Sequence, residues 1–132
     1  MAMINAYKMD GLGNDFIIVD RRTTSINLTK DKIIELGKRD NIGFDQIIFI
    51  EKEKDKSFPI TIYNSDGGEV SACGNGSRCI AYLLSKKINS KIIKIKTNNR
   101  ILNAEIVGNL SVKLNMGKPL FDWDKIPLSK EL

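Results

Sequence analysis

The chain has 132 residues, of which 42% are apolar and 28% are charged, a composition that fits one folded domain and excludes a disordered polyampholyte. No apolar run approaches the roughly 18 residues of a membrane-spanning helix, and the start lacks the basic and apolar regions of a secretory signal, so we expect no membrane partner and a cytoplasmic location. The net charge is +5, but the lysines alternate with acidic or apolar residues and no aromatic RNA-binding signature accompanies them, so we expect no nucleic-acid partner.

The amino-terminal half of the chain alternates short apolar runs with glycine-rich turns. β-Forming residues over Ile4–Met9 are followed by a glycine-rich loop at Gly11–Asp15, and the apolar run Phe16–Val19 predicts a buried strand. Thr29 has the side chain of a helix N-cap, and the apolar residues after it predict a helix that continues to about Lys38. Two further strands are predicted at Gln46–Ile50 and Phe58–Tyr63.

The carboxy-terminal half predicts one long helix and three strands. After a turn rich in Asn, Asp and Gly at Asn64–Gly68, we expect a helix to begin near Gly74. From Cys79 onward this helix is nearly all apolar, so we expect it to be buried on most sides. Tight turns at Asn98-Asn99 and Gly108-Asn109 then separate the strands of a meander. These strands are Ile92–Thr97, Ile101–Val107 and Leu110–Asn115.

The order of these elements predicts a fold class and a domain boundary. Many strands with two helices are typical of an α+β fold and do not fit regular βαβ repetition. From Met116 onward, Pro119 and Pro127 punctuate a segment in which no further periodic element is complete. We therefore predict one domain over residues 1–117 and a linker that leaves it over residues 118–132.

The composition also limits the chemistry. The chain has no histidine, which excludes Ser-His, Cys-His and histidine-metal sites within it. Its two cysteines are too few for a structural zinc site, so we expect no metal. Acid–base work at neutral pH must then fall to a cysteine, a carboxylate or a lysine with a shifted pKa.

Cys73 stands directly before the predicted start of the second helix. A thiol in this position lies beside unpaired N–H groups at the positive end of the helix dipole, which lowers the pKa of a cysteine. Gly74 and Gly76 have no side chains to keep a carboxylate from those N–H groups. An inert buried thiol is an equally good interpretation of Cys73 from spacing alone, whereas Cys79 lies among apolar residues and is expected to be structural.

Several polar positions give only weak signals by themselves. The loop at Gly11–Asp15 lacks the full dinucleotide-binding fingerprint, and a tight turn between strands accounts for it. Asn64, Asp66 and Glu69 are turn formers first and ligand contacts second. Gln46 is unusual at the start of an apolar strand but is not diagnostic.

Four motifs nevertheless occur in order along the chain. They are Lys8-Met9-Asp10-Gly11-Leu12-Gly13-Asn14-Asp15-Phe16, Gly43-Phe44-Asp45-Gln46, Asn64-Ser65-Asp66-Gly67-Gly68-Glu69 and Cys73-Gly74-Asn75-Gly76-Ser77-Arg78-Cys79. This series resembles the amino-terminal half of the diaminopimelate epimerase family. The match runs from about Ile4 to Met116-Gly117, and the cysteine-centred motif is highly specific.

The resemblance implies a fold in which a sheet of mixed strands wraps around a central helix, repeated twice in the complete enzyme. It implies epimerisation of LL-diaminopimelate to meso-diaminopimelate, a precursor of lysine and of the bacterial cell wall, without a cofactor. In this interpretation Cys73 exchanges the α-proton of the amino-acid substrate. The substrate-binding residues would be Asn14, Gln46, Asn64, Gly74 and Asn75.

The chain departs from the family pattern in three ways. Asp10 stands where many members carry histidine, and Phe44 stands near Gln46 where the family often has a small residue. The largest departure is length, because complete members carry a second cysteine in a carboxy-terminal half that is missing here. We therefore expect no epimerisation by this chain alone, and we expect the missing half to be its partner.

Three functions stay open on the sequence. The first is an epimerase half, the second is a related isomerase such as a proline racemase or a phenazine-biosynthesis isomerase, and the third is a non-catalytic binding module on the same scaffold. The set Asn14, Asn64 and Asn75 favours the diaminopimelate member, and an intact Cys73 argues against a module without activity. A homodimer also stays open, because a half-molecule exposes an apolar face that could self-associate.

Overall fold

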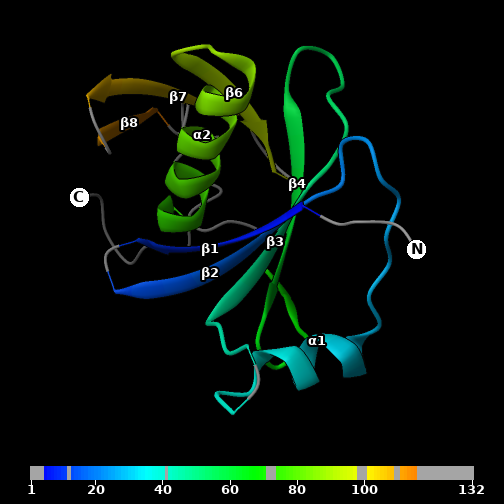
Figure 1. Ribbon diagram of the computed structural model, residues 1–132. Coiled ribbons are helices and arrows are strands. Elements are labelled where there is room, and N and C mark those ends of the chain that lie inside the picture. The colour runs from blue at the N-terminus through cyan, green and yellow to red at the C-terminus, as the bar shows by residue number, and fades with distance from the viewer. Residues whose placement is uncertain are drawn as a thin grey trace, which may run out of the picture.

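The computed structural model describes residues 5–11, 13–40, 42–70, 74–97, 101–108 and 111–115. The predicted linker at 118–132 and the predicted turns at 98–99 and 109 lie outside these residues, and so does Cys73. Figure 1 shows the elements, which in chain order are β1 (Asn5–Gly11), β2 (Asn14–Asp20), α1 (Lys30–Gly37), β3 (Gln46–Ile50), β4 (Phe58–Asn64), β5 (Glu69–Val70), α2 (Gly74–Ile88), β6 (Ile92–Lys96), β7 (Ile101–Gly108) and β8 (Ser111–Asn115).

The strands form one curled, mixed sheet in the order β1-β2-β3-β4-β6-β7-β8, with β5 paired to β4. The pairs β2–β3 and β4–β6 are parallel and the other neighbouring pairs are antiparallel. The sheet curls around α2, whereas α1 lies outside the curl (Figure 1). The α+β fold expected from the sequence and the central helix implied by the resemblance are both confirmed.

The inner face of the sheet and α2 share the main hydrophobic core. On α2, Ile80, Ala81 and Leu84 are fully buried, and Cys79 is 7% exposed. Buried positions alternate along β4, β6 and β7, because successive side chains of a strand point to opposite faces and only one face meets this core. The prediction that Cys79 is buried among apolar residues is confirmed.

A second core lies on the outer face of the sheet, where α1 packs on β2 and β3. Ile33 of α1 is buried there in one cluster with Ile17, Val19, Phe44, Ile47 and Phe49. Because β2 and β3 are covered on both faces, their apolar runs are continuous and do not alternate. The predicted start of α1 is confirmed, since Oγ1 of Thr29 accepts a hydrogen bond of 3.1 Å from the backbone N–H of Lys32.

The β1–β2 hairpin differs from the sequence prediction. Gly11 pairs with Asn14 across the hairpin, so Asn14 and Asp15 belong to β2 and not to a loop. Strand pairing can continue this far because Gly13, in the turn, adopts a φ of +90°, a conformation that glycine reaches without steric cost. The hairpin therefore holds Asn14 on the sheet itself.

The strands after Val70 follow the prediction to within one residue at each end. The antiparallel pairs β6–β7 and β7–β8 form the predicted meander. The short strand β5 has no sequence signal, because two residues cannot establish the alternation that marks a strand. Among the described residues, neither helix combines the length and the apolar character that crossing a membrane requires.

Candidate active site

Three polar residues stand at the ends of neighbouring strands. Asn14 begins β2, Gln46 begins β3 and Asn64 ends β4. Gln46 lies opposite Phe16 in the parallel pair and opposite Asn64 in the antiparallel pair. The fold therefore brings three residues that the resemblance marked as substrate contacts to one end of the sheet, which we call the Asn14 end.

All three side chains belong to the face of the sheet that packs against α2. Residues two positions apart in a strand share a face, and the residues two positions inward from these three are buried in the main core. Those inward neighbours are Phe16, Ile48 and Ile62, which belong to the same cluster as Ile80 and Leu84 of α2. The Asn14 end is thus the polar margin of the α2-facing core.

Gln46 and Asn64 are joined by a hydrogen bond across β3 and β4. Nε2 of Gln46 donates to Oδ1 of Asn64 at 3.0 Å. In this amide orientation, Oε1 of Gln46 is buried and has no hydrogen-bond partner among the described residues. A buried acceptor without a donor costs about 1–3 kcal/mol, so this oxygen is suited to a donor group of a ligand.

The last turn of α2 lies beside the other end of β2. Near its last turn, Lys87 places Nζ 3.9 Å from Oδ2 of Asp20 and 4.7 Å from the ring centre of Tyr7. Asp20 ends β2, opposite to Asn14. The 15 residues of α2 extend about 22 Å, which matches the length of the seven-residue β2. Because its last turn lies beside Asp20, the helix begins far from the Asp20 end of the sheet.

The start of α2 provides the chemistry for binding an anion. The first N–H groups of a helix have no intrahelical partner and carry the positive end of the helix dipole. Within the described part of the chain, the first turn of α2 holds no acidic residue, and Gly74 and Gly76 carry no side chains. A carboxylate can bind at such a terminus. The predicted helix start near Gly74 is confirmed.

Ser77, in the early part of α2, is a feature that the sequence did not predict. Its side chain is completely buried, and its hydroxyl has no hydrogen-bond partner among the described residues. A serine near a helix start is ordinarily interpreted as a capping or solvent-facing residue. The local sequence does not reveal its burial, because that burial depends on the sheet that curls around the helix. Its place in the cysteine-centred motif was the one available signal.

Two of the predicted site residues are not placed by the described structure. Cys73 lies outside the described residues, and so does the side chain of Asn75, so their roles stay predictions. Cys73 is nevertheless joined directly to Gly74, the first residue of α2. No group of three or more His, Cys, Asp or Glu residues within the described ranges is arranged to hold a metal ion.

The two residues that depart from the family pattern lie away from the α2-facing side. Asp10 pairs with Asp15 across the hairpin, and Asp15 shares the outer face with the residues that pack on α1. The pKa of Asp15 is held below its usual value of 3.8, mainly by a hydrogen bond with Asp10 and next by a hydrogen bond from Arg39. The same hydrogen bond with Asp15 raises the pKa of Asp10. Phe44 is buried in the core beneath α1.

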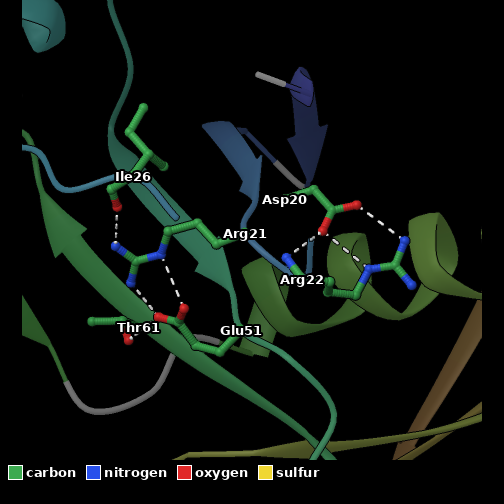
Figure 2. A network of polar contacts seen from close by, with 6 residues as sticks. All are labelled: Asp20, Arg21, Arg22, Ile26, Glu51 and Thr61. Atoms are coloured by element: carbon green, nitrogen blue, oxygen red, sulfur yellow. Dashed lines mark hydrogen bonds and ion pairs between the residues drawn. The ribbon is translucent and has the colours of Figure 1, made fainter. Parts of the chain in front are cut away.

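The opposite end of β2, which we call the Asp20 end, carries polar groups that are paired within the protein (Figure 2). Asp20 is 7% exposed and accepts hydrogen bonds of 3.0 Å from Nε, Nη2 and the backbone N–H of Arg22. Arg21 donates from two guanidinium nitrogens to the carboxylate of Glu51 and from a third to the backbone oxygen of Ile26. These contacts indicate that the charged residues of the Asp20 end stabilise the fold.

A surface depression of about 830 Å³ lies beside the Asp20 end and is lined by residues 21–27, Glu51 and Lys52. It does not make a convincing anion site, because the guanidinium groups of Arg21 and Arg22 already pair with carboxylates of the protein. The better candidate for a functional site is the Asn14 end, where a buried polar atom is left for a ligand.

Comparison with known proteins supports the family resemblance. A family model described as diaminopimelate epimerase matches residues 6–121. Diaminopimelate epimerase from Pelagibacter ubique (strain HTCC1062) is 48% identical over 129 residues, covering 98% of this chain and 47% of that relative. The enzyme of the same name from Wolbachia sp. subsp. Brugia malayi (strain TRS) is 44% identical over 123 residues, covering 92% of this chain and 46% of that relative. The chain spans about half the length of the curated relatives it matches.

Solved structures with the same fold are more distant in sequence. A phenazine biosynthesis protein of the PhzF family from Bacillus anthracis superposes with a TM-score of 0.57 at 21% identity, covering 86% of this chain and 38% of that protein. A PhzF family protein from Enterococcus faecalis gives a TM-score of 0.59 at 13% identity, covering 77% and 40%. At this level of identity the likeness establishes the fold and says nothing of the reaction.

Proposed function

Because the chain belongs to the diaminopimelate epimerase family, we propose that it is the amino-terminal half of an enzyme that converts LL-diaminopimelate to meso-diaminopimelate. Residues 1–117 form its domain, and residues 118–132 lead toward a second domain. The observation that carries the proposal is the hydrogen-bonded pair of Gln46 and Asn64 at the margin of the α2-facing core, where Gln46 keeps a buried oxygen without a partner among the described residues. Cys73 stands immediately before the first residue of α2. The product serves lysine and cell-wall synthesis in the cytoplasm.

In the proposed reaction, Cys73 handles the proton on one face of the substrate. A thiolate next to the positive end of α2 removes the α-proton, and the electron pair of the broken C–H bond spreads onto the adjacent carboxylate. The N–H groups at Gly74 and Asn75 bind that carboxylate and stabilise the negative charge that develops on it. A thiol with an ordinary pKa near 8.5 removes such a proton only with this stabilisation. The chemistry needs no cofactor.

The amide side chains orient the amino-acid substrate. Asn14, Gln46 and Asn64 are neutral, so they present donors and acceptors without competing for the charge of Cys73. The buried Oε1 of Gln46 accepts a hydrogen bond from an N–H group of the substrate. Asn75 contributes its side chain from the first turn of α2.

The chain alone contains one of the two proton-handling residues. Inversion of a stereocentre requires a second group that returns a proton to the opposite face, and the second half of the enzyme supplies it. We therefore expect the isolated chain to perform no epimerisation, and its partner is that second half. The PhzF-like fold supports an alternative isomerase only as a protein of the same architecture, and no contact among the described residues favours it.

Deuterium incorporation tests the proposed function. The chain is incubated in D2O with LL-diaminopimelate, alone and after mixing with the carboxy-terminal half of the Pelagibacter ubique relative. We expect meso-diaminopimelate with deuterium at the α-carbon in the mixture and not with the chain alone. A mixture that is folded and associated but incorporates no deuterium contradicts the proposal.

Two cysteine variants form a matched pair in the same assay. Cys73→Ala should abolish the restored activity, because it removes the base. Cys79→Ala should keep the activity and lower the free energy of unfolding by about 1 kcal/mol, because it removes one buried heavy atom from the core. If Cys79→Ala is the inactive variant and Cys73→Ala the active one, the assignment of the two thiols is wrong.

A further inference from the structure

Arg39 joins two strands on the outer face, directly behind the candidate site. Its Nη1 donates to Oδ2 of Asp15 at 2.7 Å, and its Nη2 donates to Oδ1 of Asp45 at 2.9 Å. Asp15 follows Asn14 on β2, and Asp45 precedes Gln46 on β3. We call Arg39, Asp15 and Asp45 the Arg39 clamp.

Hydrogen bonds donated by backbone N–H groups extend the clamp to Ser65, the residue that follows β4. The N–H of Asp15 donates to Oδ2 of Asp45 at 2.9 Å, and the N–H of Asp45 donates to the backbone oxygen of Asp15 at 3.0 Å. The N–H of Ser65 donates to the backbone oxygen of Asp45 at 3.1 Å. Ser65 follows Asn64 in the chain. The clamp therefore holds a neighbour of each of the three amide residues of the site.

Close packing fixes the segment that carries Arg39. Gly37, at the end of α1, lies so near the turn after β4 that an added Cβ atom would come within 2.9 Å of Cβ of Ser65. On the other side of Arg39, Gly43 has a φ of +74° and approaches the Arg39 side chain, where an added Cβ would meet Cδ at 3.2 Å. Neither position has room for a side chain without a shift of its neighbours. The guanidinium is thus presented by a tightly packed backbone.

The high exposure of the clamp indicates that it fixes the positions of strand ends and contributes little to folding stability. The Arg39 side chain is 61% exposed, and ion pairs at such positions contribute little to folding stability because water and salt screen them. A guanidinium that binds Asp15 of β2 and Asp45, the residue before β3, does, however, fix the distance between the ends of these two strands. Small displacements of groups that hold a substrate strongly reduce catalysis.

We propose that Arg39 is a positioning residue that sets the spacing of Asn14, Gln46 and Asn64 for the substrate without touching it. This inference rests on the proposed function for the role of the three amides, whereas the clamp itself is independent of it. Without Arg39, the carboxylates of Asp15 and Asp45 repel each other across β2 and β3, and the strand ends separate.

The first experiment needs no ligand and measures amide hydrogen exchange in the isolated chain. In Arg39→Ala, the N–H groups of Asp15 and Ser65 should exchange about tenfold faster, and the side-chain amide signal of Gln46 should shift, because local opening of the strand ends frees these groups. Arg39→Lys should show a smaller change, since one ammonium group cannot span both carboxylates as the guanidinium does.

Arg22→Ala is the matched control, because it removes an ion pair at the other end of the same strand. It should leave the exchange rates of the Asp15 and Ser65 N–H groups unchanged. It should nevertheless lower the free energy of unfolding more than Arg39→Ala does, because the buried Asp20 loses the side-chain donors of Arg22. Unchanged exchange at Asp15 and Ser65 in Arg39→Ala, or equal acceleration by Arg22→Ala, overturns the clamp whatever the chain binds.

The second experiment measures the affinity of LL-diaminopimelate for the chain mixed with the supplied second half. Arg39→Ala should weaken binding about tenfold or more, Arg39→Lys should restore part of it, and Arg22→Ala should bind as the unmodified chain does. Equal losses of affinity for Arg39→Ala and Arg22→Ala mean that binding follows stability, and the positioning role is then wrong. If the unmodified chain binds nothing, the proposed function fails while the exchange result still decides the clamp.

Discussion

The side chains of β2 that face α2 begin with Asn14 at one end of the strand and end with Asp20 at the other. Between them, Phe16 and Ile18 are fully buried in the main core. Asp20 is paired with Arg22 and lies near Lys87, so its charge is satisfied by the protein itself. At the Asn14 end, the neighbouring Gln46 keeps a buried oxygen that has no partner in the described part of the chain.

The difference separates polar groups that support the fold from those that are left for a ligand. A buried carboxylate with several donors stabilises one arrangement of β2, Arg22 and the end of α2. A buried amide oxygen without a donor weakens the fold slightly and is expected at a binding site, where the ligand completes the hydrogen bond. The four variants or conditions below test this division, from the largest expected effect to the smallest.

Ile80→Ala should affect both ends, because α2 supports both. Ile80 is completely buried, and truncation to alanine leaves a cavity that costs about 2–5 kcal/mol in the free energy of unfolding. Urea denaturation of the chain measures this loss. A loss below about 1 kcal/mol would mean that α2 is not the centre of the core.

Arg22→Ala should affect the Asp20 end alone. Removing the Arg22 side chain leaves the buried Asp20 with the backbone N–H of residue 22 and with Lys87 at 3.9 Å, and an under-satisfied buried charge costs about 1–3 kcal/mol in the free energy of unfolding. Urea denaturation measures the loss, with Lys52→Ala, an exposed lysine of the same region, as the control. Equal stability of the two variants contradicts a structural role for the pair.

The Asp20 end should also lose stability in acid. Burial acts to raise the pKa of Asp20, but the hydrogen bonds and charge of Arg22, with the charge of Lys87, outweigh it and hold the pKa below the usual 3.8. Because the folded pKa is the lower one, the stabilisation is complete above pH 3.8 and is lost as the pH falls through the folded pKa. Thermal unfolding followed from pH 6 downward should show this loss, and Asp20→Asn should reduce the pH dependence. An unchanged pH dependence in that variant counts against the pairing.

Asp10→Asn should have the smallest effect. The hydrogen bond with Asp15, and then its charge, raise the pKa of Asp10, so the favourable state has Asp10 protonated and is lost as the pH rises through that pKa. An asparagine donates to Asp15 at every pH and carries no charge. We expect a slight gain in thermal stability at pH 7 that disappears well below pH 3.8, with unchanged ligand affinity. A clear loss of affinity would place Asp10 in the site.

Local patterns in the sequence predicted most of the fold. The apolar run Phe16–Val19, the N-cap at Thr29 and the apolar stretch after Cys79 each depend on residues close in the chain, so each was predictable. The extension of β2 to Asn14 was not, because it depends on pairing with β1 across a turn. The two-residue strand β5 likewise exists only through its pairing with β4.

The candidate site was predictable only through the resemblance. Nothing in the spacing of Asn14, Gln46 and Asn64 indicates that they meet, because their meeting depends on the register of three strands that are distant in the chain. The Arg39 clamp joins residues 24 positions apart, and the burial of Ser77 depends on the curl of the whole sheet. Long-range geometry of this kind has no local signature.

The most direct test of the division between the two ends is a titration of LL-diaminopimelate into the 15N-labelled chain mixed with the supplied second half. We predict that the side-chain amide signals of Asn14, Gln46 and Asn64 shift in a saturable way, while the guanidinium signals of Arg21 and Arg22 stay unchanged. Shifts confined to Arg21 and Arg22, or no shift at any of the three amides, would contradict the assignment of the Asn14 end as the substrate site.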